Sequence, residues 1–447
     1  MSQASETSAE GLRRRVAIAS CAGTTIEFYD FFIYGTAAAL VFPKVFFPAL
    51  GTAAGTVASF ATFAVAFFAR PVGSILFGHF GDRIGRKRTL ISTLLLMGIA
   101  TVLIGLLPGA ATIGVAAPII LVVLRFAQGF AVGGEWAGAT LLAAEYAPSG
   151  QRGRYALFPQ LGPAIAFFLS SGTFVVSGLV IGFTDQAFLN YGWRVPFIAS
   201  ILLVVIGLYV RLRIEETPVF RRQQEQAASA RPTGLPFAGA VKSQGREILL
   251  GAGAAILFFA FFYMGTAFFT TYGTAKPPNG AGLDRITVLS LGMVAAVFFA
   301  GMTILASILS DRYGRRRLLM IANGLAIPWA LVLFPILGTG PWGFAIGLTG
   351  TLVIFAIAYG PMGAYLPELF ETRYRYTGAG LAYNLAGVLG GGIPPLVATG
   401  LLASYGGFAV GIMLAGIAAV SLVCGLVLTE TVDRDLAAQP ATSPAGT

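Results

Sequence analysis

Long runs of apolar residues, separated by short polar segments, dominate this chain. Each run extends over about 20 residues, which is the length that a helix needs to cross the hydrocarbon core of a bilayer. The pattern predicts twelve such helices, at roughly 16–40, 56–79, 89–108, 112–144, 155–180, 194–212, 248–272, 286–309, 318–338, 342–366, 377–402 and 407–428. We therefore expect an all-α integral membrane protein.

The composition agrees with this interpretation and argues against several classes of protein. Of the 447 residues, 56% are hydrophobic and only 11% are charged, whereas about a quarter are charged in soluble proteins. The net charge of +10 comes from short basic clusters between apolar runs, so nucleic-acid binding is not expected. Cys21 and Cys424 lie near opposite ends of the chain without metal-like spacing, and no metal site is expected.

The basic clusters predict the orientation of the chain and its division into two parts. Most lysines and arginines fall in segments that share one side of the membrane with the N-terminus, and positive segments remain cytoplasmic. An even number of helices then places the C-terminus inside as well. The longest inner segment, 213–247, contains the polar stretch RRQQEQAASARPTG and is interpreted as a cytoplasmic linker. It separates an N-terminal six-helix bundle at 1–212 from a C-terminal bundle with a short tail at 248–447.

The two halves repeat one another. GHFGDRIGRKR at 78–88 follows the second helix of the first half, and SILSDRYGRRR at 307–317 follows the second helix of the second half. Two parallel copies related by an axis along the membrane normal are typical of carriers. The repeat therefore favours two pseudo-symmetric bundles and alternating access over a channel.

At 78–88 the chain resembles the major facilitator superfamily, because it matches that superfamily's pattern G-x-x-x-D-R-x-G-R-[KR] between the second and third helices. The resemblance implies the major facilitator fold and a cytoplasmic latch that stabilises the outward-open state. Physically, a glycine lets helices approach, an aspartate accepts hydrogen bonds and arginines reach acids on neighbouring helices. The expected gate residues are Gly78, Asp82, Arg83, Gly85, Arg86, Lys87, Glu145, Arg152, Asp311, Arg312, Arg315, Glu368 and Arg373.

Further segments narrow the resemblance. RFAQGFAVGGEW at 125–136 is similar to the superfamily's R-x-x-x-G-x-x-x-G signature, and its spacing puts Gly129 and Gly133 on one face, where a neighbouring backbone can come close. Together with IEFYDFFIYG, ARPVGSILFGHFGDRIGRKR and WRVPF, this segment resembles the metabolite:proton symporters. That group includes carriers of shikimate, 2-oxoglutarate, proline/betaine and dicarboxylates, so the resemblance leaves the substrate open.

Charged residues inside the predicted helices are confined to the first half. If the first helix begins near Val16, Glu27 and Asp30 lie about 17 Å and about 21 Å from its inner end, near the middle of the membrane. A charge facing lipid at that depth costs at least about 2.5 kcal/mol, so such residues need a function or a partner. Their spacing allows both acids to point into a central cavity. The expected proton-coupling residues are Glu27, Asp30, Arg125 and Glu135.

The charge of these acids connects them to the substrate. Burial and a neighbouring carboxylate both favour the neutral form of an acid, so Glu27 or Asp30 could take up a proton at ordinary pH. One bound proton would free Arg70 or Arg125 to hold an anionic group, which would enforce symport. Permanent ion pairs that fix helix packing are the competing interpretation. The expected substrate-binding residues are Arg70, Arg125, Tyr29, Tyr34, Gln160, Tyr263, Tyr359, Tyr383 and Asn384.

The sequence thus predicts a secondary active transporter that imports a small organic acid or zwitterion by proton symport, without a cofactor. A proton-coupled antiporter that exports a metabolite or drug has the same architecture, and betaine or proline uptake is an alternative substrate class. One histidine, two scattered cysteines and no P-loop argue against an enzyme. We expect a multi-pass monomer in the inner (plasma) membrane, with substrate, protons and lipid as its partners.

Overall fold

The described part of the chain is helical and contains no strand. A computed structural model gives the backbone of residues 3–84, 86–133, 151–181, 185–213, 236–371 and 374–432. The side chains in these ranges are described except at 3–17, 19, 78–84, 86–87, 185, 210–211, 213 and 236–238.

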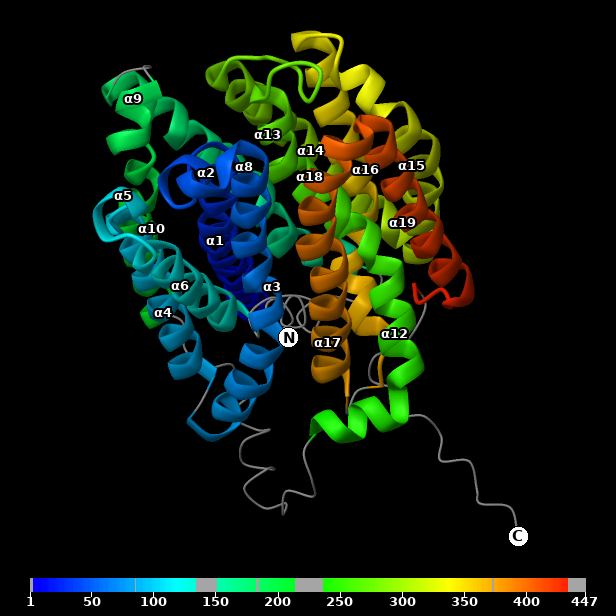
Figure 1. Ribbon diagram of the computed structural model, residues 1–447. Helices are drawn as coiled ribbons and strands as arrows, with labels where there is room; N and C mark the ends of the chain where they lie inside the picture. The colour runs from blue at the N-terminus through cyan, green and yellow to red at the C-terminus, as the bar shows by residue number, and fades with distance from the viewer. Residues whose placement is uncertain are drawn as a thin grey trace.

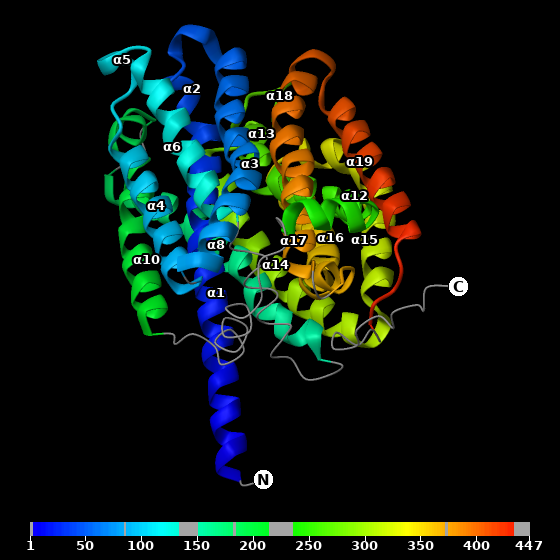
Figure 2. The same ribbon diagram turned by 90° about the horizontal axis from the view of Figure 1, so that it is seen from below.

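The first half of the chain forms one group of helices, drawn from blue to green (Figure 1). Its long helices are α1 (Gln3–Leu40), α3 (Gly51–Ile84), α4 (Arg86–Leu106), α6 (Ala116–Val132), α8 (Arg152–Ile181) and α10 (Arg194–Arg213). Short turns join them at α2 (Phe42–Val45), η1 (Pro48–Leu50), α5 (Ala110–Ile113), α9 (Asp185–Ala187) and η2 (Phe188–Gly192). Helix α1 projects beyond the other helices at its N-terminal end (Figure 2).

The second half forms the other group, drawn from green to red (Figure 1). Its helices are α12 (Pro236–Tyr263), α13 (Phe269–Thr274), α14 (Arg285–Tyr313), α15 (Arg315–Leu337), α16 (Pro341–Glu368), α17 (Arg375–Ala386), α18 (Ile393–Tyr405) and α19 (Gly407–Val427). The π-helical turns η3 (Met264–Phe268) and η4 (Gly387–Gly392) join α12 to α13 and α17 to α18.

The expected all-α membrane fold is confirmed. Among the described residues, ten helices are long and apolar enough to span a membrane, α6 is a shorter apolar helix, and α1 contains the first predicted span. The main difference is at α12, which begins at Pro236, well before the predicted start at 248. The backbone bends at Gln244 (φ −128°, ψ 29°), so the end of the predicted linker is a helix set at an angle to the spanning one.

Apolar side chains cover the outside of the molecule. Val115, Leu179, Val180 and Leu249 keep between 64% and 79% of their surface exposed. Large apolar surfaces of this kind are not stable in water and indicate contact with lipid. The chain is therefore a multi-pass membrane protein.

Glycines allow α3 and α6 to cross in close contact. A Cβ at Gly129 would overlap the carbonyl oxygen of Ala66, and one at Gly133 would overlap that of Arg70. From the other helix, a Cβ at Gly73 would overlap the carbonyl oxygen of Phe130. The expected close approach of a neighbouring backbone to Gly129 and Gly133 is confirmed. It brings Arg70 on α3 and the end of α6 to the same level.

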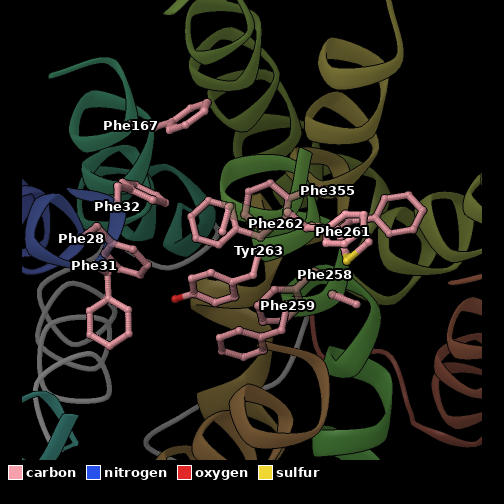
Figure 3. Packing of buried hydrophobic residues seen from close by; sticks show 14 of the residues in the cluster. Phe28, Phe31, Phe32, Phe167, Phe258, Phe259, Phe261, Phe262, Tyr263 and Phe355 are labelled. Carbon is pink, nitrogen blue, oxygen red and sulfur yellow. The ribbon is translucent and has the colours of Figure 1, made fainter. Parts of the chain in front are cut away.

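The two halves meet along several pairs of helices. Helix α8 packs on α14, α1 reaches η3 and α13, and α3 packs on η4 and α18. Aromatic rings fill much of this interface (Figure 3). The ring of Phe262 on α12 lies 5.8 Å from that of Phe28 and 5.3 Å from that of Phe32, both on α1. Such edge-to-face contacts hold the halves together without polar groups.

Both π-helical turns of the second half lie at this interface. Segment η3 directly follows Tyr263 and contacts α1, whereas η4 begins three residues after Asn384 and contacts α3. The π-helical turns are rare and occur preferentially at functional sites. Their positions point to the region around Tyr263, Tyr383 and Asn384.

Replacing Gly129 by leucine should destabilise the protein, because the side chain would force α3 and α6 apart. We expect a loss of about 1–3 kcal/mol of folding free energy, the usual cost of overpacking, measured as a lower melting temperature of the purified protein in detergent. Gly301→Leu on α14 is the matched control, since no atom lies within 4 Å of a Cβ there. Equal melting temperatures for the two variants would contradict the close approach.

Candidate functional site

A small, partly open cavity lies between the two halves, and about 240 Å³ of space in it, open solvent included, is free of protein atoms. Its lining comes from α1, α3, the end of α6 and α17: Glu27, Arg70, Val132, Gly133, Gly380, Tyr383 and Asn384. The first half supplies the two charged side chains, and the second half supplies a phenol and an amide. The lining thus offers groups that can bind both the charged and the neutral polar parts of a small molecule.

The C-terminal wall of the cavity is anchored to the other half. The Asn384 side-chain amide donates to the carbonyl oxygen of Gly133, at 3.0 Å. The ring of Tyr383 packs edge-on against Phe259, with centroids 4.7 Å apart. A small change in the position of α17 would therefore be transmitted directly to the end of α6.

Arg70 is the cation among the described residues that line the cavity. Only 2% of its surface is exposed, and its guanidinium carbon lies 4.3 Å from the ring centroid of Phe31 and 4.8 Å from that of Phe67. Its Nε and Nη2 atoms have no hydrogen-bond acceptor among the described residues. Tyr263 closes the far side of this cluster, with its ring 4.8 Å from Phe67 and 5.6 Å from Phe63. A buried guanidinium with unused donors can bind a carboxylate.

Arg125 does not line the cavity and instead lies in an aromatic cage. Its guanidinium carbon is 3.9 Å from the ring centroid of Tyr34, 4.2 Å from Phe31 and 5.1 Å from Phe63. Phe31 therefore contacts both buried guanidinium groups. Each cation–π contact contributes about 0.5–2 kcal/mol, which offsets part of the cost of removing the charge from water.

The side chains of Asp30 and Glu27 have different surroundings, although both residues lie on α1. Glu27 lines the cavity, whereas Asp30 is not among the lining residues and accepts a hydrogen bond from Thr101 on α4 through Oδ2, at 2.7 Å. The expectation that both acids point into the cavity therefore holds for Glu27 only. The physical reason is packing: the positions differ by about 60° around the helix, and α4 covers the Asp30 side.

The tyrosines of the first half form contacts within that half. The Tyr29 hydroxyl donates to the carbonyl oxygen of Pro196, at 3.1 Å, and lies 3.1 Å from the hydroxyl of Thr173. The Tyr34 hydroxyl donates to Thr62, at 2.8 Å, while its ring faces Arg125. Neither tyrosine is among the residues that line the cavity.

Gln160 and Tyr359 lie at the interface between the halves. The Gln160 amide on α8 donates to the carbonyl oxygen of Tyr359 on α16, at 2.7 Å. The Tyr359 ring stacks on Phe355, with centroids 4.8 Å apart. Neither residue lines the cavity.

A second charged cluster joins the halves at the N-terminal end of α8 and the C-terminal ends of α14 and α16. The Asp311 carboxylate of α14 accepts hydrogen bonds from the backbone amides of Gly153 and Arg154, at 2.8 Å and 3.1 Å, in the first turn of α8. Exposed amides and the helix dipole both favour a carboxylate at this position. The contact connects the C-terminal half to a helix of the N-terminal half.

The same cluster contains ion pairs that also cross between the halves. Arg315 lies 3.0 Å from Asp311 and 3.2 Å from Glu368, and Arg152 of the first half lies 3.6 Å from Glu368. Four of the expected gate residues thus come together. Arg312, a fifth, is exposed and lies over the ring of Tyr313, outside this cluster.

The other expected site residues fall outside the described side chains. They are the gate residues Gly78, Asp82, Arg83, Gly85, Arg86, Lys87, Glu145 and Arg373 and the proton-coupling candidate Glu135. Within the described residues, no group of three His, Cys, Asp or Glu side chains could hold a metal ion.

The contacts of the segment that follows α19 were not expected from the sequence. The Glu430 carboxylate accepts hydrogen bonds from the backbone amides of Arg315 and Arg316, at 2.9 Å and 3.1 Å, and so caps α15. The Thr431 hydroxyl donates to Glu368, at 2.6 Å. The only signal in the sequence was an acidic residue, Glu430, between two threonines after the last apolar run. Nothing in the sequence indicated its partners.

Thr101 and Gln128 were missed as well. The Gln128 amide on α6 donates to the Thr101 hydroxyl, at 2.7 Å, and Arg125 Nη1 donates to the Gln128 oxygen, at 3.1 Å. Both residues are polar side chains in otherwise apolar helices, which was a detectable signal. Their connection to Asp30 depends on how α1, α4 and α6 pack.

Comparisons with known proteins agree with this architecture. The family model of the Major Facilitator Superfamily matches residues 21–395. The chain is 47% identical to the inner membrane metabolite transport protein YhjE of Escherichia coli (strain K12), with 95% of this chain and 96% of that protein covered. It is 39% identical to the shikimate transporter of the same organism, with 88% and 89% covered.

Solved structures support the fold independently. The crystal structure of a D-xylose-proton symporter superimposes with a TM-score of 0.70, at 18% sequence identity, and the match covers 94% of this chain and 98% of that one. At this identity the likeness concerns the fold alone. The chain belongs to the Major Facilitator Superfamily and, within it, to the metabolite:proton symporter family, and it is a membrane transporter of metabolites, not an enzyme.

Proposed function

We propose that this transporter imports a small carboxylate together with a proton, by alternating access across the inner membrane. The observation that carries the proposal is the buried Arg70 guanidinium, which has unused donors and lines the cavity beside the acid Glu27. Two unused N–H groups on one planar guanidinium match the two oxygens of a carboxylate. Tyr383 and Asn384 would contact the rest of the molecule from the other half.

The acids supply the proton coupling in this proposal. Glu27 shares the cavity with Arg70, so a carboxylate that binds Arg70 meets the negative charge of Glu27 unless that acid is protonated. Asp30 affects Arg125 through the hydrogen bonds behind the cavity. Proton binding before substrate binding removes the repulsion and makes the two events interdependent.

Zwitterions are a second substrate class that the same cavity favours. Proline and betaines carry a carboxylate for Arg70 and a cationic group that a charged Glu27 would attract. A plain organic acid requires Glu27 to be neutral, whereas a zwitterion is compatible with its charge. The two classes therefore differ in how Glu27→Gln should affect binding.

The charged cluster at the inner ends of α8, α14 and α16 would act as the cytoplasmic gate. It must separate when the cavity opens to the cytoplasm, because Asp311 and Gly153 belong to different halves. With positive segments inside, the N- and C-termini lie in the cytoplasm. Export by proton antiport remains the alternative direction, and transport into vesicles of known orientation distinguishes it from import.

Replacing Arg70 by glutamine should abolish carboxylate binding, because the neutral amide offers fewer donors and no charge. In a thermal-shift screen with shikimate, 2-oxoglutarate, proline and glycine betaine, a ligand at 100 times its Kd stabilises the wild type by about 2.7 kcal/mol. We expect that shift to disappear in Arg70→Gln and to persist in the control Arg312→Gln, whose side chain is exposed. An undiminished ligand shift in Arg70→Gln would exclude Arg70 as the binding cation.

Glu27→Gln and Asp30→Asn should each stop accumulation driven by a pH gradient, because neither amide can exchange a proton. Exchange of labelled for unlabelled substrate without a gradient should continue in Asp30→Asn, since that side chain does not line the cavity. Glu371→Gln, at an exposed position, is the control and should transport normally. The proposed proton role is wrong if both variants accumulate substrate as well as the wild type does.

Asp311→Asn should weaken the inner gate, because the neutral amide caps the first turn of α8 less well. Charge at a helix N-terminus contributes about 0.3–2 kcal/mol, so the population with separated inner ends should rise up to roughly thirtyfold. Spin labels on the inner ends of α8 and α14 would report it as a longer distance. Asp284→Asn is the matched control, because Asp284 caps the opposite end of α14. Its carboxylate accepts hydrogen bonds from Thr287, which lower its pKa below the usual range. Identical distance distributions in both variants would argue against the Asp311 contact as a gate.

A further inference from the structure

The contact between Asp30 and Arg125 is indirect. Asp30 Oδ2 accepts from Thr101, and Oδ1 has no hydrogen-bond partner among the described residues. Arg125 uses Nη1 to bind Gln128, while its Nε and Nη2 have no acceptor in the described part of the chain. The two charges are therefore connected through two neutral side chains, from α4 and α6.

The intervening hydrogen bonds all run in one direction. Arg125 Nη1 donates to Gln128 Oε1 at 3.1 Å, Gln128 Nε2 donates to Thr101 Oγ1 at 2.7 Å, and Thr101 donates to Asp30 at 2.7 Å. The chain begins at a cation and ends at an anion, so each bond polarises the next one and strengthens it. Gln128 is held in one amide orientation because Arg125 can only donate.

The Thr101 hydroxyl has a second acceptor within reach. Its oxygen lies 2.9 Å from the carbonyl oxygen of Met97, one turn earlier on α4. A hydroxyl has one proton to donate and two lone pairs to accept with. Thr101 can therefore donate either to Asp30 or to Met97 while it keeps the hydrogen bond from Gln128.

We infer that Thr101 and Gln128 are positioning residues that couple protonation of Asp30 to the hydrogen bond between Arg125 and Gln128. The inference rests on the proposed proton coupling and names the side chains through which Asp30 would act. It assigns these residues no contact with substrate. Their role is to transmit a change of charge from α1 to α6.

Protonation of Asp30 reverses one hydrogen bond of this chain. A proton from the outer solution binds Asp30 and forms one new O–H bond, and this hydroxyl then donates to Thr101. The proton of Thr101 stays on its oxygen and turns to the Met97 carbonyl. The chain is now reversed at Thr101 and no longer ends on a negative charge, so the polarisation that held Arg125 on Gln128 is lost. Release of the proton from Asp30 to the cytoplasm restores the original direction.

Few titratable groups face Asp30. Among the described residues they are Arg125 from α6 and Tyr29 from its own helix, with Glu27 one turn earlier on α1. Helix α4 presents the neutral Thr101, while α8 and α10 present Thr173 and the Pro196 carbonyl to the Tyr29 hydroxyl. The connection to Arg125 is therefore the main route by which Asp30 can affect another charge.

Infrared difference spectroscopy of the full-length protein in lipid tests the relay without a known substrate. A pH titration should change the carboxylic acid band that Asp30→Asn removes. Arginine labelled with ¹⁵N identifies the guanidinium bands, and Arg125→Lys assigns those of Arg125. We expect the Arg125 bands to change together with the Asp30 band in the wild type. This joint change should be lost in Thr101→Val and in Gln128→Met.

Conservative and matched variants separate a relay from a general structural effect. Thr101→Ser keeps the hydroxyl and should restore the joint change. Thr93→Val is the control on the same helix, because the Thr93 hydroxyl bonds only to the carbonyl oxygen of Leu90 among the described residues, at 3.0 Å. A purely structural role of Thr101 would lower the melting temperature and leave the Arg125 bands following the Asp30 band.

The possible failures are distinguishable. If the Asp30 band titrates but the Arg125 bands do not follow it, or if they still follow it in both Thr101→Val and Gln128→Met, the relay is wrong and Asp30 remains the proton site. If Asp30→Asn removes no titrating band, the proposed proton site itself is wrong.

Discussion

Two buried guanidinium groups that share one phenyl ring are the constraint on which the centre of this protein depends. Removing a guanidinium from water costs several kcal/mol even after the protein relaxes, and two like charges repel each other. Phe31 contacts both Arg70 and Arg125, and Phe67, Tyr34 and Phe63 add further ring contacts. These rings stabilise the cations in part and leave donors unused. The remaining electrostatic demand is what an anion in the cavity can satisfy.

The two halves contribute differently to this centre. Charged side chains come from α1, α3 and α6, which the glycine contacts between α3 and α6 bring close together. The opposite wall consists of Tyr383 and Asn384 on α17, close to a π-helical turn. The wall from the first half thus presents charged groups, and the wall from the second half presents neutral polar groups beside an irregular helix. This difference suits a carrier in which one wall closes on a substrate held by the other.

The helix ends around Asp311 and Glu368 are held by backbone groups as much as by ion pairs. Asp311 caps α8 across the interface, and Glu430 caps α15 within the second half. Arg315 and Glu368 lie between these two caps and are paired with each other. A change at Asp311 therefore affects a connected set of contacts that extends to the segment after α19.

The hydrophobic pattern alone determined the number, approximate limits and membrane nature of the helices, because lipid satisfies no backbone hydrogen bond and each span must be helical over its whole width. It also identified Arg70 and Glu27, because a charge at mid-membrane is costly wherever it faces. Only the tertiary structure decided that Asp30 turns away from the cavity to Thr101, and that Arg125 lies in an aromatic cage. Thr101 is 71 residues from Asp30 in the chain, and Glu430 is 115 residues from Arg315. The sequence contains no signal for such pairs, because the direction of a side chain around a buried helix depends on which neighbours cover each of its faces.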